Sequence, residues 1–173
     1  MDWTSVALRA AGGDAEALEA LVDGCYGTVR GYCVAMDGAR DSDDLAQITF
    51  ERAFRALPGF RGELSATTWL IGIARHVCID HQRSEQRARR RHERSHSPTR
   101  HEPDPADAVA LADLLERLRP DRREALLLTQ VLGLSYAEAA AVCGCPVGTI
   151  RSRVARARAD LLGGDADLSV AGQ

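Results

Sequence analysis

The chain has 173 residues and a mass of 18.7 kDa, a length that allows one ordinary domain or two small ones. Its apolar residues are mainly alanine and leucine and only 5% of the chain is aromatic, which favours helices over strands. No run approaches the roughly 20 apolar residues that span a bilayer, and the acidic start lacks the pattern of a secretory signal. We therefore expect a cytoplasmic protein without membrane insertion, whose five cysteines stay reduced.

The net charge of −3 hides two basic patches. Every basic residue is arginine, and residues 84–101 hold six arginines against two acids. A second patch, residues 147–162, carries four arginines against Asp160 alone. Local patches of this kind suit contacts with phosphates without making the whole chain basic. Solvated helix faces account for them equally well when charge alone is considered.

Three helices are predicted in the first half of the chain. Asp14, after two glycines, is a good N-cap for a helix whose apolar stripe extends to Tyr32. Acidic residues from Ser42 onward mark the first turn of a second helix, which ends at Pro58 and Gly59. After a loop over 60–66, a third helix follows, and its periodicity disappears among the arginines after residue 86.

The second half also reads as helical, after a predicted linker. Residues 95–105 contain three prolines and no large apolar residue, so we predict a flexible linker there. Short helices are expected over 109–118 and from Pro120 to Gly133, and a last helix through Leu162. The predicted fold is all-α, with two small helical domains. The predicted boundaries are 1–94 for the first domain, 95–105 for the linker, 106–163 for the second domain and 164–173 for a disordered tail.

The strongest motif is a helix-turn-helix at 135–158. Ser135 and Glu138 form a capping box at the start of a short helix that ends at Gly144. In the following helix Ile150, Val154 and Leu161 are expected to pack inward, which leaves arginines on the outward side. An apolar rear and an arginine-bearing front are the requirements for a helix that reads the major groove of DNA. A helical hairpin with a polar face is the structural alternative.

The segment Pro146-Val147-Gly148-Thr149-Ile150-Arg151-Ser152-Arg153, followed by Arg156-Ala157-Arg158, resembles the signature of extracytoplasmic-function (ECF) sigma factors. The preceding residues 132–140 are similar to the same pattern. The resemblance implies that the last helix reads the promoter −35 element as duplex DNA. Many family members have a bulkier residue where this chain has Ala155. The −35 contacts that the resemblance implies are Thr149, Arg151, Ser152, Ala155, Arg156 and Arg158.

Residues 43–54 resemble the family segment that grips the clamp coiled coil of RNA polymerase. We expect Leu45 and Phe54 on the buried side of this helix, and the family usually has Glu where this chain has Ile48. Plain core packing is the alternative interpretation of an amphipathic helix of this kind. The polymerase contacts that the resemblance implies are Asp44, Leu45, Gln47, Phe50, Arg52 and Arg55.

Residues 68–76 resemble the family helix that melts the promoter and reads the −10 element as single-stranded DNA. A base taken from the stack needs a receiving pocket, which we place in the loop 60–66 and the start of this helix. Trp69 is expected mainly in the core, and Asp80 is expected to orient an arginine rather than to touch DNA. The −10 residues that the resemblance implies are Phe60, Arg61, Trp69, Arg75, His76, Asp80 and Arg83.

Metal and catalytic chemistry are not expected. His76, Cys78 and His81 lie within one and a half helical turns, but four ligands at tetrahedral spacing are not evident. Cys143 and Cys145 fall in the other predicted domain, and the remaining cysteines are most simply core residues. No phosphate-binding glycine loop, nucleophile elbow or pair of catalytic carboxylates is present. We therefore predict no metal, no cofactor and no enzyme.

Taken together, the residues and the resemblance predict an ECF sigma factor that directs core RNA polymerase to promoters. The expected partners are core polymerase, through its β′ clamp and β flap, and promoter DNA, as duplex at −35 and as single strand at −10. The resemblance also suggests an anti-sigma factor as a partner. A polymerase-independent helix-turn-helix repressor or activator remains the second hypothesis, and an RNA-binding adaptor the third.

Overall fold

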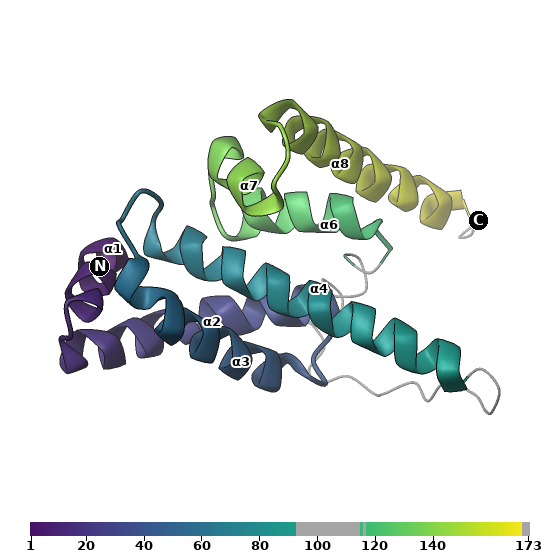
Figure 1. The fold of residues 1–173 in the computed structure, drawn as a ribbon. Coiled ribbons are helices and arrows are strands. Elements are labelled where there is room, and N and C mark those ends of the chain that lie inside the picture. Colours follow the sequence, from purple (N-terminus) through teal and green to yellow (C-terminus); the bar gives the residue numbers. More distant parts are fainter. Residues whose placement is uncertain (93–114, 116, 171–173) are drawn as a thin grey trace. The chain divides into compact units, whose positions relative to one another are not determined.

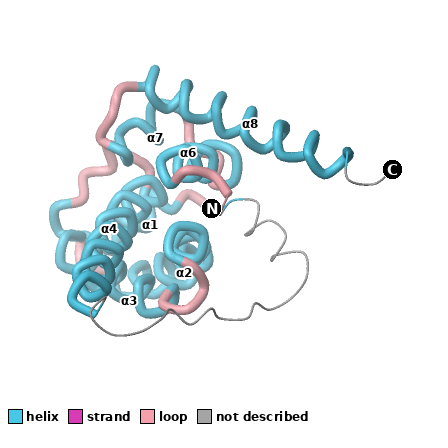
Figure 2. Tube along the Cα trace, turned by 90° about the vertical axis from the view of Figure 1, so that its right-hand side faces the viewer, coloured by secondary structure: helices cyan, strands magenta, loops and turns pink. Residues whose placement is uncertain are grey.

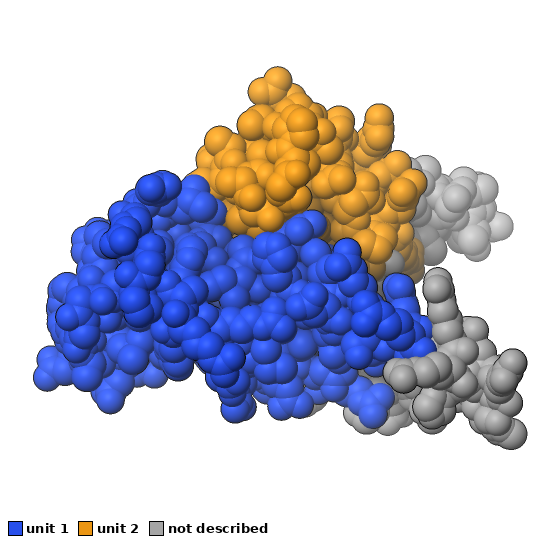
Figure 3. Space-filling model, viewed as in Figure 1, with its two compact units in different colours: residues 1–98 blue, residues 99–173 orange. Residues whose placement is uncertain are grey.

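The described residues of the computed structural model form helices and turns without any strand (Figure 2). The structure describes the backbone of residues 1–92, 115 and 117–170, and the side chains of residues 1–88, 115 and 117–162. The prediction of an all-α fold is therefore confirmed. The chain divides into two compact units, residues 1–98 and 99–173 (Figure 3), each of which is taken by itself below. The predicted linker, 95–105, lies outside the described residues.

Unit 1 is a helical bundle (Figure 1). Its elements are α1 (Trp3–Ala11), α2 (Ala15–Asp37), α3 (Ser42–Ala56), the 3-10 turn η1 (Leu57–Gly59) and α4 (Ala66–His92). Helices α2, α3 and α4 each pack against the other two, and α1 packs on α2 and on the start of α4. The core between them contains Leu21, Tyr32, Leu45, Leu70 and Ile71, all with at most 2% of their surface exposed. This three-way packing fixes which sides of α3 and α4 face outward.

Local capping signals set the starts of these helices. The Asp14 carboxylate accepts from the Ala17 N–H at 3.0 Å, which confirms Asp14 as the N-cap of α2. Helix α3 begins at Ser42 as predicted. Helix α1 was not predicted, because the first predicted helix begins after Asp14. Its signal was Asp2, whose carboxylate accepts from the Thr4 N–H at 3.0 Å.

Unit 2 contains α6 (Pro120–Leu126), the π-helical turn η2 (Leu127–Val131), α7 (Tyr136–Cys143) and α8 (Val147–Val170) (Figure 1). Ser135 and Glu138 form the predicted capping box. Gly144 ends α7 in the left-handed conformation with φ of 61°, which a residue with a Cβ adopts only with strain. Helix α8 packs against both α6 and α7, as a helix-turn-helix requires. Of the helix predicted over 109–118, most lies outside the described residues.

The end of α8 differs from the prediction. The sequence predicts that this helix ends at Leu162 and that residues 164–173 form a disordered tail, whereas α8 continues to Val170. Gly163 and Gly164 do not stop it, because a glycine in a helix interior weakens the helix by only about 1 kcal/mol and leaves the backbone hydrogen bonds in place. Residues 171–173 lie outside the described part of the chain.

Candidate functional site

The outward face of α3 is a polar stripe with two apolar residues in it. Its exposed residues recur at intervals of three and four, which places them on one side of the helix. Ile48 is 38% exposed and Phe54 is 40% exposed, so both offer apolar surface to a partner. We call this set the α3 face; its members are Asp44, Gln47, Ile48, Glu51, Phe54 and Arg55.

Two predictions for α3 are wrong in their helix phase. Leu45, which was expected on the buried side and also named among the polymerase contacts, is 2% exposed, which confirms its burial. Phe50 was expected to contact polymerase, but it is only 5% exposed and also holds α3 in the core. Phe54 was expected to be buried and instead lies half-exposed. The ring of Phe50 stacks on Tyr26 of α2 with centroids 6.1 Å apart, and this contact draws Phe50 inward. Because the buried stripe is centred on Leu45, Thr49 and Ala53, Phe54 falls at its edge.

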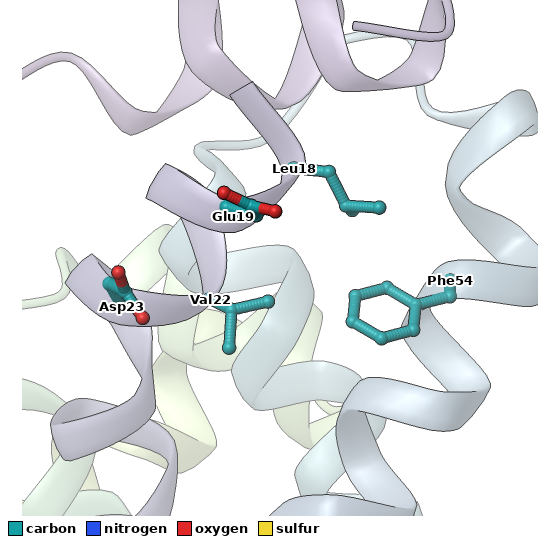
Figure 4. Close-up of a pocket in the computed structure, with 5 residues that line it drawn as sticks. All are labelled: Leu18, Glu19, Val22, Asp23 and Phe54. Atoms are coloured by element: carbon teal, nitrogen blue, oxygen red, sulfur yellow. The ribbon is translucent and has the colours of Figure 1, made fainter. Parts of the chain in front are cut away.

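A shallow pocket adjoins Phe54 (Figure 4). It has a volume of about 330 Å³ and is lined by Leu18 and Val22 of α2 and by the Phe54 ring. Two carboxylates, Glu19 and Asp23, line the pocket on the α2 side. The apolar surface of the α3 face therefore extends onto α2 and has acidic side chains next to it.

Asp43 ties the start of α3 to α2. Its carboxylate accepts from Arg30 Nε at 2.6 Å and from the Tyr26 hydroxyl at 3.0 Å. The Arg30 guanidinium, followed by the Tyr26 hydroxyl, lowers the pKa of Asp43 because both donate to the charged carboxylate. The hydrogen bond to Asp43 raises the pKa of Tyr26, because ionisation would remove the proton that the hydroxyl donates. These contacts fix the orientation of the first turn of the α3 face.

Helix α4 carries four of the predicted −10 residues on one side. Trp69, His76, Asp80 and Arg83 are spaced by seven, four and three positions and so share a face. His76 is exposed, and its Nδ1 lies 2.8 Å from the Gly72 carbonyl oxygen. Because a carbonyl only accepts, Nδ1 donates, and the neutral ring keeps Nε2 as an acceptor on the exposed side chain.

Phe60 is a correction to the predicted −10 set. It is 6% exposed, and its ring packs on Trp69 with centroids 5.0 Å apart and an interplanar angle of 47°. A ring held in this way supports the loop and does not offer a face to a base. The Thr4 hydroxyl of α1 accepts from the Ala66 N–H at 3.2 Å, which anchors the end of the loop. Trp69 is half-buried, consistent with its expected role in the core.

The other predicted −10 residues divide into free and engaged side chains. Arg61 and Arg83 are exposed. Arg75 is half-buried and makes an interaction within the protein. Asp80 Oδ2 pairs with Arg52 Nη1 of α3 at 3.0 Å. Asp80 thus orients an arginine, as expected, and that arginine belongs to the predicted polymerase-binding set.

Helix α8 has the apolar rear and arginine-bearing front that the sequence predicts. Ile150 and Val154 are buried, whereas Leu161 is only half-buried. Arg151 and Arg156 are exposed, and among the described residues their side chains make no hydrogen bond or ion pair. The surface between them consists of small residues on the outward side of the helix. These small residues are Gly148, Ser152, Ala155 and Ala159.

Two other predicted −35 residues make side-chain hydrogen bonds within unit 2, and a third is half-buried. The Arg158 guanidinium donates to Gln130 Oε1 at 2.5 Å, so it is not as free as the other two arginines. Ser152 is half-buried and its hydroxyl donates to the Thr149 carbonyl at 2.9 Å. Thr149 is half-buried at the first turn. The sequence offered no signal for these pairings.

The structure does not bring the three candidate zinc ligands together. Cys78 is 2% exposed in the core, while the exposed His76 is bonded to Gly72. Cys25 and Cys33 are buried, as expected of core cysteines. Cys143 and Cys145 lie half-buried in unit 2.

Comparisons with known proteins match both units. Residues 5–88 match the family "Sigma-70 region 2", and residues 108–161 match "Sigma-70, region 4". The chain is 50% identical over 165 residues to the ECF RNA polymerase sigma factor SigC of Mycobacterium tuberculosis (strain CDC 1551 / Oshkosh), covering 92% of this chain and 89% of that protein. It is 36% identical over 143 residues to the ECF sigma factor EcfG of Rhodopseudomonas palustris (strain TIE-1), covering 78% and 77%.

Solved structures agree in fold. The sigma factor RpoE in its complex with the anti-sigma factor NepR from Bartonella quintana matches with a TM-score of 0.73 and 28% identity, covering 83% of this chain and 92% of that chain. CnrH, in its complex with the cytosolic domain of CnrY, matches over the full length of both chains with a TM-score of 0.70 and 27% identity.

Among the helices that the structure describes, none is long and apolar enough to cross a bilayer. The region 2 family matches unit 1 and the region 4 family matches unit 2, while the similarity to relatives such as SigC extends over both units. The chain therefore belongs to the ECF RNA polymerase sigma factors, with sigma-70 region 2 in unit 1 and region 4 in unit 2.

Proposed function

We propose that this sigma factor divides promoter-specific initiation among three helix faces. The α3 face binds core RNA polymerase. The outward side of α4, with the loop before it, binds the melted −10 element as a single strand. Helix α8 reads the −35 duplex. The observation that carries this division is that all three faces are exposed and chemically distinct. The face on α3 combines polar and apolar side chains, the face on α4 carries histidine and arginine, and the face on α8 carries arginines with small residues between them.

Polymerase binding by the α3 face rests on its combination of groups. Ile48 and Phe54 supply apolar surface, while Gln47 and Arg55 supply hydrogen-bond donors around it. Apolar anchors surrounded by polar groups are the arrangement found where binding energy concentrates in protein interfaces. Ile48 replaces a usual glutamate, so we propose an apolar contact with the β′ clamp at a position where relatives make a polar one.

The −10 proposal rests on exposed donors along α4. Arg61 and Arg83 are exposed and can follow the phosphates of a single strand, and the Nε2 acceptor of His76 can bond an exposed base. Asp80 acts as a positioning residue, because its carboxylate is engaged by Arg52. Phe60 packs against Trp69 and shapes the receiving loop.

The −35 proposal rests on Arg151 and Arg156. Their guanidinium groups have no partner in the described protein, and so they can pair with guanine edges or phosphates without breaking a contact. The small residues between them let the helix approach the groove closely. Arg158 contributes less, since reaching DNA requires it to leave Gln130.

The setting and the regulation are proposals as well. We infer that the protein acts in the cytoplasm, where core polymerase and promoter DNA are found, and that it has no catalytic activity of its own. The B. quintana relative was solved with an anti-sigma factor. We propose that this chain also has an anti-sigma partner, which would compete with polymerase or DNA for the same faces.

Run-off transcription with reconstituted holoenzyme tests the proposal. The full chain mixed with core RNA polymerase is expected to start transcripts at defined promoters, and the double variant Gln47→Ala/Arg55→Ala is expected to bind polymerase more weakly. A matched control is Arg40→Ala/Gln86→Ala, which also removes one exposed arginine and one exposed glutamine, but outside the α3 face. Equal polymerase binding by both double variants would reject the α3 face. Tight polymerase-free binding to a palindromic site, without transcription, would favour an independent regulator.

A further inference from the structure

A cluster of possible metal ligands lies away from the three proposed faces, where α2 ends and α3 begins beside α4. Asp41, His81 and Glu85 each direct one ligand atom into it, and these atoms all lie within 4.8 Å of one another. We propose that this cluster binds a divalent transition-metal ion, with Zn²⁺ as the probe of choice. No metal site was predicted at this position, because His81 was grouped with His76 and Cys78.

His81 is oriented as a metal-binding histidine is. Its Nδ1 lies 2.8 Å from Asp37 Oδ2, and the Asp37 side chain is only 8% exposed. Because a carboxylate accepts, Nδ1 carries the proton, which leaves Nε2 as the ring's metal-binding atom. A carboxylate bonded to the far nitrogen is the usual support of a histidine that ligates zinc, since it fixes the tautomer and raises the basicity of the ring. Asp37 would thus support the site without touching the ion.

Asp41 faces His81 and does not cap its own helix through its side chain. It occupies the N-cap position of α3, where an aspartate ordinarily accepts from a backbone N–H of the first turn, yet it makes no such bond. Its Oδ2 lies instead 3.8 Å from His81 Nε2. This separation is too long for a direct hydrogen bond, so the two acceptor atoms face each other without a bond between them. A metal ion between them would accept a lone pair from each.

Spacing and accessibility suit an ion. His81 and Glu85 are four residues apart on α4 and lie on the same side of that helix, while Asp41 comes from the neighbouring element. Zinc–nitrogen and zinc–oxygen bonds of about 2.0–2.2 Å place tetrahedral ligands roughly 3.3 Å apart. Side-chain rotations that shift the ligand atoms by about 1 Å would close the cluster. Asp41, His81 and Glu85 are all half-buried, which leaves a path for the ion and a position for water.

Nitrogen and oxygen ligands without sulfur define the class of metal. One imidazole and two carboxylates suit Zn²⁺ and its neighbours in the first transition row, whereas Ca²⁺ and Mg²⁺ favour sets made of oxygen alone. Glu85 also interacts within the protein, so the ion would share or replace that contact. A bound ion would join the end of α2, the start of α3 and α4, and would stabilise unit 1 by binding only its folded form.

Metal binding to the full chain, stripped with a chelator, tests the proposal. Isothermal titration with Zn²⁺ is expected to show one site per chain, and Zn²⁺ is expected to raise the Tm. Because thiols are good zinc ligands and Cys143 and Cys145 are only half-buried, all measurements use a Cys143→Ser/Cys145→Ser background. Co²⁺ is the second probe, since its visible absorption distinguishes a tetrahedral nitrogen–oxygen site from one with thiolates.

Variants locate the site. Glu85→Gln and Asp41→Asn keep side-chain size and remove a ligand charge, and each is expected to abolish the Tm shift. Asp37→Asn is expected to weaken Zn²⁺ binding about 10–100-fold, as loss of a supporting carboxylate does elsewhere. His76→Ala, which removes an imidazole outside the cluster, is the matched control and is expected to keep the full shift. The proposal would be overturned if the Cys143→Ser/Cys145→Ser parent bound no Zn²⁺. It would also be overturned if Zn²⁺ raised the Tm of Glu85→Gln and of Asp41→Asn as much as it raises the Tm of that parent.

Discussion

Arg52 of α3 and Asp80 of α4 form an ion pair across the bundle, with Nη1 and Oδ2 3.0 Å apart. The family resemblance assigns the first residue to polymerase binding and the second to the −10 element. Their pairing means that a substitution at either position changes the surroundings of the other. Effects of Asp80 variants on promoter opening therefore need to be separated from effects on α3.

A double-mutant cycle measures this pair. Both side chains are about half exposed, at 44% and 56%, so solvent screens their attraction and we expect a coupling of only about 0.2–1 kcal/mol. Denaturant unfolding of the parent, Arg52→Ala, Asp80→Ala and the double variant gives that value, and added salt is expected to reduce it. Strict additivity of the two single changes would mean that the pair does not stabilise the bundle.

Substitutions on α8 are expected to have graded effects. Arg151→Ala and Arg156→Ala should each cost about 1–3 kcal/mol in −35 binding, because each removes a guanidinium that is free to pair with DNA. Arg158→Ala should cost less, since Gln130 already holds that side chain. Competition binding of holoenzyme to −35 duplexes measures the loss.

Arg117→Ala is the matched control for the −35 series, because Arg117 is exposed in unit 2 but lies before α6. It removes the same charge without changing the recognition helix. An equal loss for Arg117→Ala and Arg151→Ala would indicate general electrostatic attraction and would count against base reading by α8.

Two glycines in α2 are expected to respond in opposite ways to alanine. A Cβ on Gly24 would lie 1.8 Å from Cη2 of Trp3, so Gly24→Ala forces the indole to move and should destabilise unit 1 by about 1–3 kcal/mol. Gly27 has open space around it, and Gly27→Ala should stabilise α2 by up to about 1 kcal/mol through helix propensity. Thermal unfolding distinguishes the two, and a gain in Tm for Gly24→Ala would show that α1 does not depend on this contact.

Thiol reactivity is expected to divide the five cysteines. Cys25, Cys33 and Cys78 are buried, and burial raises the pKa of Cys25 to about 11, so its thiol stays protonated near neutral pH. A hydrogen bond from Cys78 lowers the pKa of the Cys33 thiol. Cys33 is nevertheless fully buried, so a reagent cannot reach it. A chromogenic thiol reagent should therefore modify Cys143 and Cys145 in the native chain and all five after unfolding. Modification of Cys33 under native conditions would show that α2 and α4 separate readily.

Protonation of Asp43 in acid should remove its contribution to the free energy of unfolding. Arg30 and Tyr26 lower the pKa of Asp43 in the folded state, so the stabilisation is complete above the unfolded value near 3.9 and is lost as pH falls through the lower folded value. Asp43→Asn should thus be less stable than the parent at neutral pH, and the difference should vanish in strong acid. A difference in the free energy of unfolding that does not change with pH would contradict this assignment.

Several features could be predicted because they depend on neighbours within a few residues. The Asp14 cap, the box of Ser135 and Glu138, and the left-handed Gly144 involve atoms at most five positions apart. The inward position of Ile150 and Val154 follows from their spacing of four in a helix with one apolar side. The same local patterns carry the resemblance to the sigma factor family.

The side on which Phe54 lies and the burial of Phe50 could not be predicted in this way. Both are apolar, and a helical period of 3.6 places either near the boundary of a buried stripe. Stacking of Phe50 on Tyr26, which comes from another helix, selects the phase of α3. The burial of Phe60 likewise depends on Trp69, which the turn into α4 brings over it.

The sequence by itself determined the all-α class, most helix starts and the arginine-bearing recognition helix, since these follow from hydrogen bonds and periodicity along one segment. Only the tertiary structure decided which charged groups are engaged. Arg52 with Asp80 and Arg158 with Gln130 are each 28 residues apart, and the grouping of Asp37, Asp41 and His81 spans three helices. An arginine or a histidine looks the same in the sequence whether its side chain faces solvent or bonds another residue. The packing of helices against one another decides which of the two occurs.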